Sequence, residues 1–191
     1  MSTEISKAAD IVTANVRANR GGTESVAAGG VFTVTCTGAD GQVKWTDTFH
    51  NLVVNEGLQD MNEKYFKSVG YTAAFYLGLV TGPGASNTYA AGNTLATHAG
   101  WTENTNYSGT RKAVTFGSAT LADPSVIGNS ASPASFSITS NAQVIAGALL
   151  CTVASGTSGI LFSVGNFTGG DKTVDSGDTL SVTYTFSLDA A

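Results

Sequence analysis

The sequence carries few charged side chains. Only 12% of its 191 residues are Asp, Glu, Lys or Arg, which is about half the fraction usual for a soluble domain. The nine basic residues are scattered, with Arg111 and Lys112 the one adjacent pair, and the net charge is −5. Because nucleic acids are bound by clustered Lys and Arg, we expect no nucleic-acid partner.

Cysteine is also scarce, with Cys36 and Cys151 as the two examples. Neither lies in a Cys-x-x-Cys or zinc-ligand spacing. Cys36 shares a predicted strand face with Phe32 and Val34, and Cys151 ends an apolar run. Both are therefore predicted to be buried thiols in a chain made in a reducing cytoplasm, with a disulfide between them as the alternative.

Long apolar segments are missing as well. No run approaches the 18 or so apolar residues that a membrane-spanning helix needs, so we expect no membrane span. Residues 1–7 lack the apolar core of a secretory signal. The sequence thus predicts a chain without a signal peptide.

A strict alternation between residues 178 and 188 is the strongest positive signal. Large apolar side chains at every second position are separated by Ser and Thr. Successive side chains of a strand point to opposite faces, so this pattern predicts a strand with one buried face and one hydroxyl face. The predicted buried residues are Leu180, Val182, Tyr184, Phe186 and Leu188.

A hairpin is predicted near the start of the chain. Residues 31–37 and 43–49 both alternate, and Asp40-Gly41 between them is a strong turn signal because both residues tolerate positive φ. Further strands are predicted at 71–80, 112–119, 135–139, 142–153, 159–164 and 179–188.

Residues 55–67 do not follow the strand period of two, and their pattern predicts the one helix. Leu58, Met61, Tyr65 and Phe66 recur at helical spacing, and Asn55 is the predicted N-cap. This apolar stripe is expected to cover an open end or edge of the β-core. The fold predicted for residues 30–191 is mainly β, an antiparallel, jelly-roll-like β-sandwich of about eight strands with one α-helix.

Residues 1–29 are predicted to form an N-terminal arm with few large apolar groups. Ile5, Val12 and Val16 could share one face of a helix, with Ile11 beside them. Two interpretations stand: a disordered tail, or an arm that becomes ordered on a neighbouring subunit. In the second, these four residues are partner contacts.

The long segment 81–112 offers three further candidate contacts, Tyr89, Trp101 and Tyr107. Aromatic side chains in a polar loop can bind a partner or a carbohydrate, or they can hold the loop on its own core. The sequence shows no constellation for catalysis: His50 and His98 have no conspicuous acid partner. The acid cluster Asp171, Asp175 and Asp178 is typical of a turn, with calcium binding as the alternative. We expect no enzyme activity, cofactor or metal.

Six short motifs carry a further signal: residues 50–60, 76–80, 98–103, 107–111, 159–163 and 176–186. Together they resemble a family of small virion proteins of tailed bacteriophages. The resemblance implies a capsid decoration (cement) protein on the outer head surface, made in the bacterial cytoplasm. Its implied partners are the major capsid protein and other copies of itself, most simply as a trimer. The alternative is a tail, collar or fibre component with a receptor- or glycan-binding role.

Overall fold

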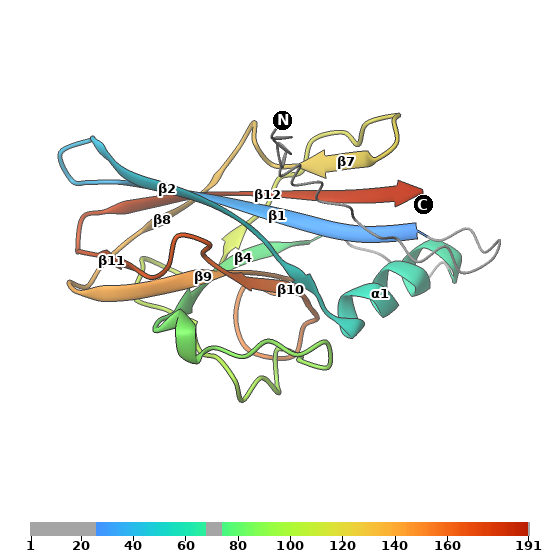
Figure 1. Ribbon diagram of the computed structural model, residues 1–191, viewed down its shortest axis with the longest axis horizontal. Helices are drawn as coiled ribbons and strands as arrows, with labels where there is room; N and C mark the ends of the chain where they lie inside the picture. The colour runs from blue at the N-terminus through green and yellow to red at the C-terminus, as the bar shows by residue number, and fades with distance from the viewer. Residues whose placement is uncertain (1–25, 68–73, 191) are drawn as a thin grey trace, which may run out of the picture.

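A computed structural model describes residues 26–67 and 74–190, which form two antiparallel sheets packed face to face and one helix (Figure 1). Strands account for 45% of the structure and helix for 9%. The predicted antiparallel β-sandwich is confirmed.

The first sheet is built around the long final strand. The predicted hairpin and the predicted last strand are both confirmed, and Gly41 has the positive φ of 79° that the turn requires. The first strand begins at Val26, so residues 26–29 of the predicted arm belong to the sheet. The strands, in spatial order, are β2 (Val43–His50), β1 (Val26–Thr37), β12 (Thr179–Ala190) and β7 (Ser125–Gly128), with β8 (Ala134–Ser137) also paired to β12.

The second sheet contains more short strands. Its central members were predicted from the sequence, whereas β3, β5 and β11, each two or three residues long, were missed, as was the four-residue β7 of the first sheet. The spatial order is β3 (Leu52–Val53), β10 (Leu161–Asn166), β9 (Gln143–Cys151), β4 (Tyr76–Thr81) and β5 (Glu103–Asn104). In addition, β6 (Lys112–Ala113) pairs with β4, and β11 (Lys172–Val174) with β9. A short 3₁₀ helix, η1 (Gly84–Ser86), follows β4.

The predicted strand at 112–119 is wrong beyond Ala113. The Val114 N–H donates to the Phe75 carbonyl beside the second sheet, whereas the Gly117 N–H donates to the Gly128 carbonyl of the first. The segment therefore crosses from one sheet to the other, and its backbone hydrogen bonds are divided between them.

The main core lies between the two sheets. Leu180, Val182 and Tyr184 are buried there, as the alternation predicts, whereas Phe186 and Leu188, also predicted to be buried, are only partly buried. Phe32 lies between Phe49, on which it stacks at a centroid distance of 5.2 Å, and Tyr184, whose ring is tilted against it at 4.8 Å. On the opposite face of the first sheet, threonine hydroxyls of β1 and β2 pair at 3.0 Å, Thr33 with Thr48 among them. One face of this sheet is thus apolar and the other hydroxylated.

A second apolar cluster covers the outer face of the second sheet. The long loop after β4 lies over this face and contributes Leu95 and Trp101, which pack with Val80 and Leu149. Strands β4 and β9 are consequently buried on both faces, which explains their nearly continuous apolar sequences. Cys36 and Cys151 lie in different clusters and are free, buried thiols, as predicted. Burial, followed by the charge of Asp178, raises the pKa of Cys36 to about 11.

Gly147 of β9 provides a test of the β9–β10 pairing. A Cβ atom there would overlap the carbonyl oxygen of Gly165 on the paired strand. Because this obstacle is backbone, Gly147→Ala is expected to lower the free energy of unfolding by about 3 kcal/mol. Urea denaturation measures the loss, with Gly92→Ala as the control, since a Cβ at Gly92 meets nothing within 4 Å. Equal effects of the two substitutions would contradict the close approach of the strands.

Candidate functional site

The helix α1 (Asn55–Phe66) is confirmed, but its apolar stripe does not cover the core as predicted. Tyr65 is 82% exposed and Phe66 75%, and Leu58 is exposed as well. Met61 alone of the predicted stripe packs against the core, and it is only partly buried. The helix therefore presents aromatic side chains that no described residue covers.

Contacts at the first turn explain this orientation. The residue before the helix, Val54, is the N-cap in place of the predicted Asn55, and it makes no side-chain capping bond. Instead, the Glu56 carboxylate accepts a 2.8 Å hydrogen bond from the Leu161 N–H. Gly57 lies directly on the backbone of Phe162, where a Cβ would come within 2.6 Å of the carbonyl oxygen. The face of α1 that packs on the second sheet is thus the one that carries Gly57. The apolar stripe of the helix lies on another face.

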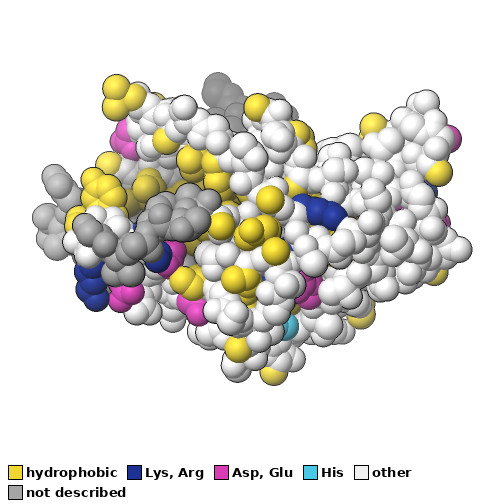
Figure 2. All heavy atoms as spheres, turned by 180° about the vertical axis from the view of Figure 1, so that it is seen from behind, with side chains coloured by type: hydrophobic (Ala, Val, Ile, Leu, Met, Phe, Trp, Pro, Cys, Tyr) yellow, Lys and Arg dark blue, Asp and Glu magenta, His cyan; other side chains and the backbone are white. Residues whose placement is uncertain are grey.

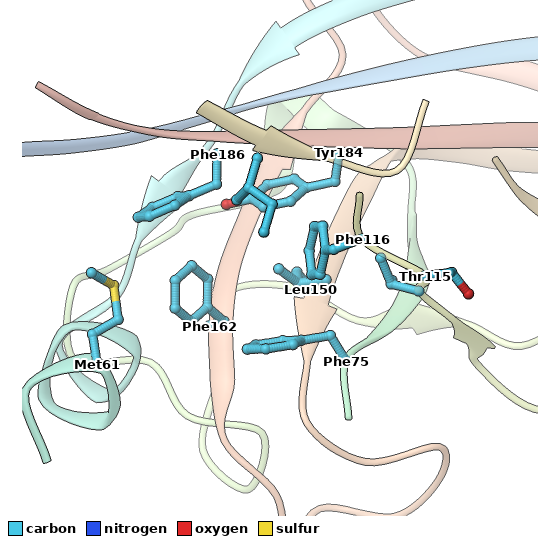
Figure 3. Close-up of a pocket in the computed structure, with 10 residues that line it drawn as sticks. Met61, Phe75, Thr115, Phe116, Leu150, Phe162, Tyr184 and Phe186 are labelled. Atoms are coloured by element: carbon cyan, nitrogen blue, oxygen red, sulfur yellow. The ribbon is translucent and has the colours of Figure 1, made fainter. Parts of the chain in front are cut away.

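Next to Met61, a cavity of about 510 Å³ opens between the two sheets. Its walls come from strands of both sheets and from the crossing segment, and Figure 3 shows aromatic side chains converging on it. Val114, Ile127 and Leu150 complete the apolar lining. Four phenylalanines dominate it: Phe75, Phe116, Phe162 and Phe186.

The phenylalanines pack edge to face. Phe75 contacts Phe116 and Phe162 with centroid distances of 5.7 Å, and Phe186 lies 5.5 Å from Phe162. Tyr184 and Thr115 carry the polar side-chain groups of the lining. None of the described residues that line it is charged, so the cavity suits an apolar occupant.

The Tyr184 hydroxyl is already engaged at the back of the cavity. It accepts a hydrogen bond from Asn51 Nδ2 at 3.0 Å and lies 3.4 Å from the Ser163 hydroxyl. Burial raises the pKa of Tyr184 to about 12, so this residue is neutral at physiological pH.

A second cavity of about 580 Å³ adjoins the first and shares Met61 with it. It is lined by the end of α1 and by the ends of β1 and β12, through Tyr65, Phe66, Val26 and Leu188. We call the surface made by the two cavities, the end of α1 and the 120–124 loop the open end of the sandwich. In Figure 2, hydrophobic side chains gather in and around a hollow on the left half of the view.

Exposed apolar side chains concentrate at this open end. The loop that carries the fully exposed Leu121 is held there, because Asp123 accepts a 3.0 Å hydrogen bond from the Ala190 N–H at the end of β12. Val43 and Val144 are exposed elsewhere, Val43 at the start of β2 and Val144 in β9. Among the described residues, four of the seven exposed large hydrophobic side chains belong to the open end: Val26, Tyr65, Phe66 and Leu121.

The aromatic residues predicted in the long loop lie away from the open end. Trp101 is 5% exposed, stacks on His98 with a 4.0 Å centroid distance, and donates from Nε1 to Asn93. Tyr107 is equally buried and packs edge to face on Phe136, and the Tyr89 hydroxyl donates to Asn166. These side chains hold the loop on its own core, which was one of the two interpretations, and Trp101 and Tyr107 offer a partner little surface.

The other predicted contacts, Ile5, Ile11, Val12 and Val16, lie outside the described residues. The predicted stop of the helix at Gly70 lies outside them too.

The three clustered aspartates accept hydrogen bonds from nearby backbone N–H groups or form an ion pair. Asp171 accepts the Gly84 N–H, Asp175 accepts the Ala142 N–H, and Asp178 forms a 2.8 Å ion pair with Lys44. Burial alone would raise the pKa of Asp178, but the bonds from Lys44 and from the Asp175 N–H reverse this and lower it. Over residues 26–67 and 74–190, no group of three or more His, Cys, Asp or Glu side chains is arranged to hold a metal ion. The turn interpretation describes these residues best.

An ion pair between Glu103 and Arg111 was not predicted. Arg111 Nε and Nη2 donate to the two Glu103 carboxylate oxygens at 2.9 and 2.7 Å, and Nη1 reaches the carbonyls of Val153 and Gly156. Both side chains are largely buried. This pair links the long loop to the β9–β10 connection, and its two members share no sequence period that would have revealed it.

Comparisons of the chain with protein-family models, with curated proteins and with solved structures find no match. In the part of the chain that the structure describes, no helix is long and apolar enough to cross a membrane.

Proposed function

We propose that this chain is a structural protein of a bacteriophage virion, a decoration protein that binds the outer surface of the head. The observation that carries the proposal is the collection of exposed apolar side chains at one end of a sandwich whose long loop, residues 81–112, is held on its own core. The resemblance of its motifs to small phage virion proteins supports the choice of the head surface.

The chemistry of the open end fits a protein partner. The cores of protein interfaces are enriched in Tyr, Phe and Met and depleted of charge. Tyr65, Phe66 and Met61 supply the aromatic and Met side chains at the second cavity, whose lining also includes Asn62 and Lys64. A contiguous exposed apolar patch on an otherwise polar protein marks an interaction site. The partner of the open end is the major capsid protein.

Symmetry strengthens such an attachment. The proposed free form is a homo-oligomer, most simply a trimer, which matches the threefold positions of a capsid lattice. Linking several modest contacts raises the overall affinity without any new contact type, because the later contacts form intramolecularly. A small apolar end on each copy is then sufficient for stable attachment.

Cryo-electron microscopy of particles that carry the chain tests the proposal. The wild-type chain should appear on the outside of the head. Tyr65→Ser with Phe66→Ser should reduce its occupancy roughly tenfold or more, because aromatic anchors at interfaces each contribute on the order of 1–2 kcal/mol or more.

The matched control is Val43→Ser with Val144→Ser, which removes two exposed apolar side chains elsewhere on the surface. This variant should decorate the head normally. Density for the chain in the tail or fibres, or no density at all, would contradict the proposal. Loss of decoration by both variants would show that attachment does not depend on the open end.

A further inference from the structure

We infer that the cavity between the two sheets is the binding site for the N-terminal segment of the same chain, with Ile5, Val12 and Val16 inserted among its phenylalanines. This inference goes beyond the proposed function and does not depend on it. It assigns an occupant to a site that the described residues form but do not fill.

The cavity is poorly suited to water. At about 510 Å³ it has room for many waters, but most of its lining is aromatic or aliphatic. A buried water needs two to four polar partners, and Thr115 and Tyr184 are the polar side chains of the lining. The Tyr184 hydroxyl already has Asn51 and Ser163 as neighbours. Because the lining offers water few hydrogen-bond partners, it is favourable for an apolar occupant to displace this water and cover the aromatic rings.

The described chain begins at the mouth of this site. Val26, the first described residue, lines the second cavity, and Met61 lines both cavities. Twenty-five residues precede Val26. The ten residues from Val16 to Val26 can span about 33–36 Å when extended, and Gly21-Gly22 gives the chain a point at which to reverse. The segment can therefore reach the first cavity from its own end of β1.

The segment also has suitable chemistry. Ile5, Val12 and Val16 are spaced by seven and four residues, a spacing that lets them share one face of a helix if the segment adopts one. Branched aliphatic side chains on one face can enter an apolar cavity while the opposite, more polar face stays in water.

Tethering favours this occupant over a second copy. A segment joined to the rim of its site acts at a millimolar effective concentration, well above that of a free protein or ligand in dilute solution. Occupation by the same chain is therefore preferred, provided that the segment can fold back on the sandwich. The glycine pair permits this reversal.

The test uses the full chain in solution. With methyl groups of Ile and Val labelled, nuclear Overhauser effects should join the methyls of Val12 and Val16 to ring protons of Phe116 and Phe162. When labelled chains are mixed with unlabelled chains, nuclear Overhauser effects within one chain should keep the same intensity per labelled chain as in the fully labelled sample. Intermolecular effects would show that a second copy supplies the segment, and would overturn the inference.

A pair of charge-matched variants provides the second measurement. Val12→Asp should open the cavity and raise the fluorescence of the apolar dye ANS several-fold, because the dye binds exposed apolar surface. Ala14→Asp adds the same charge on the opposite face of the predicted helix and should leave the fluorescence unchanged. Equal dye binding by wild type and Val12→Asp would overturn the inference, since the cavity would then be open in both.

A substitution in the cavity wall tests the inference without altering the N-terminal segment itself. Val114→Phe narrows the cavity without adding charge, so it should displace the segment and speed tryptic cleavage after Arg17 several-fold. The urea midpoint of the sandwich is measured alongside, to show that the wall variant is folded. Unchanged cleavage in a folded Val114→Phe variant would count against binding in this cavity.

Discussion

Phe32→Ala should lower the free energy of unfolding by about 4 kcal/mol, the expected cost of removing a large buried aromatic side chain. Phe32 is fully buried in β1, between the two strands that flank it, and its ring lies 5.2 Å from Phe49 and 4.8 Å from Tyr184. Those rings are held by paired strands on either side, so the space left by the deletion cannot collapse. Urea denaturation followed by intrinsic fluorescence measures the change.

Phe186→Ala is the matched control, because it removes the same side chain from the same sheet. Phe186 pairs with Gly30 of β1 but lines the open cavity and is only half-buried. In the Val12→Asp background, which leaves the cavity open, its loss is expected to cost about half as much as the loss of Phe32. Equal costs in that background would mean that the described residues cover Phe186 as fully as Phe32.

Arg111→Ala should lower the free energy of unfolding by about 3 kcal/mol, because it leaves a largely buried carboxylate without its partner. It also removes the donors to the Val153 and Gly156 carbonyls. Arg111→Lys keeps the charge but not the two-pronged geometry, so an intermediate loss is expected.

A double-mutant cycle with Glu103→Gln isolates the pair. If the two side chains stabilise the fold through each other, the double variant should lose clearly less than the sum of the single losses. Additive losses would show that the 2.7 Å contact contributes nothing of its own. The same urea titration serves for all three variants and for the wild type.

The long strands could be predicted from the sequence because their signal is local. Leu180, Val182 and Tyr184 alternate with hydroxyl residues, and a period of two is a property of the strand itself. Strands of two to four residues, such as β3 and β11, contain too few positions to show a period. They exist because longer neighbours offer them hydrogen-bonding partners, which depends on the whole fold.

The candidate site was largely hidden from the sequence for the same reason. The spacing of Met61, Tyr65 and Phe66 predicts a helix, but not which of its faces is covered. Contacts of Gly57 with Phe162 and of Glu56 with Leu161 decide that, and both join residues about a hundred positions apart. The cavity itself is assembled from separate parts of the chain, among them α1, the crossing segment, β9 and β12. No local pattern records such an assembly.

The pairing of β1 with β12 has a consequence for synthesis on the ribosome. Twelve consecutive pairs join the two strands, from Val26 with Ala190 to Thr37 with Thr179, and β12 lies between β1 and the short strands β7 and β8. The first hairpin to emerge must therefore wait for the last strand to be translated before its sheet can close. Until then β1 has an unpaired edge, and a chain that stops before Thr179 never covers it. The first sheet can therefore be completed only after β12 has been translated. Unfinished chains cannot form the sheet that carries Val26 and the open end.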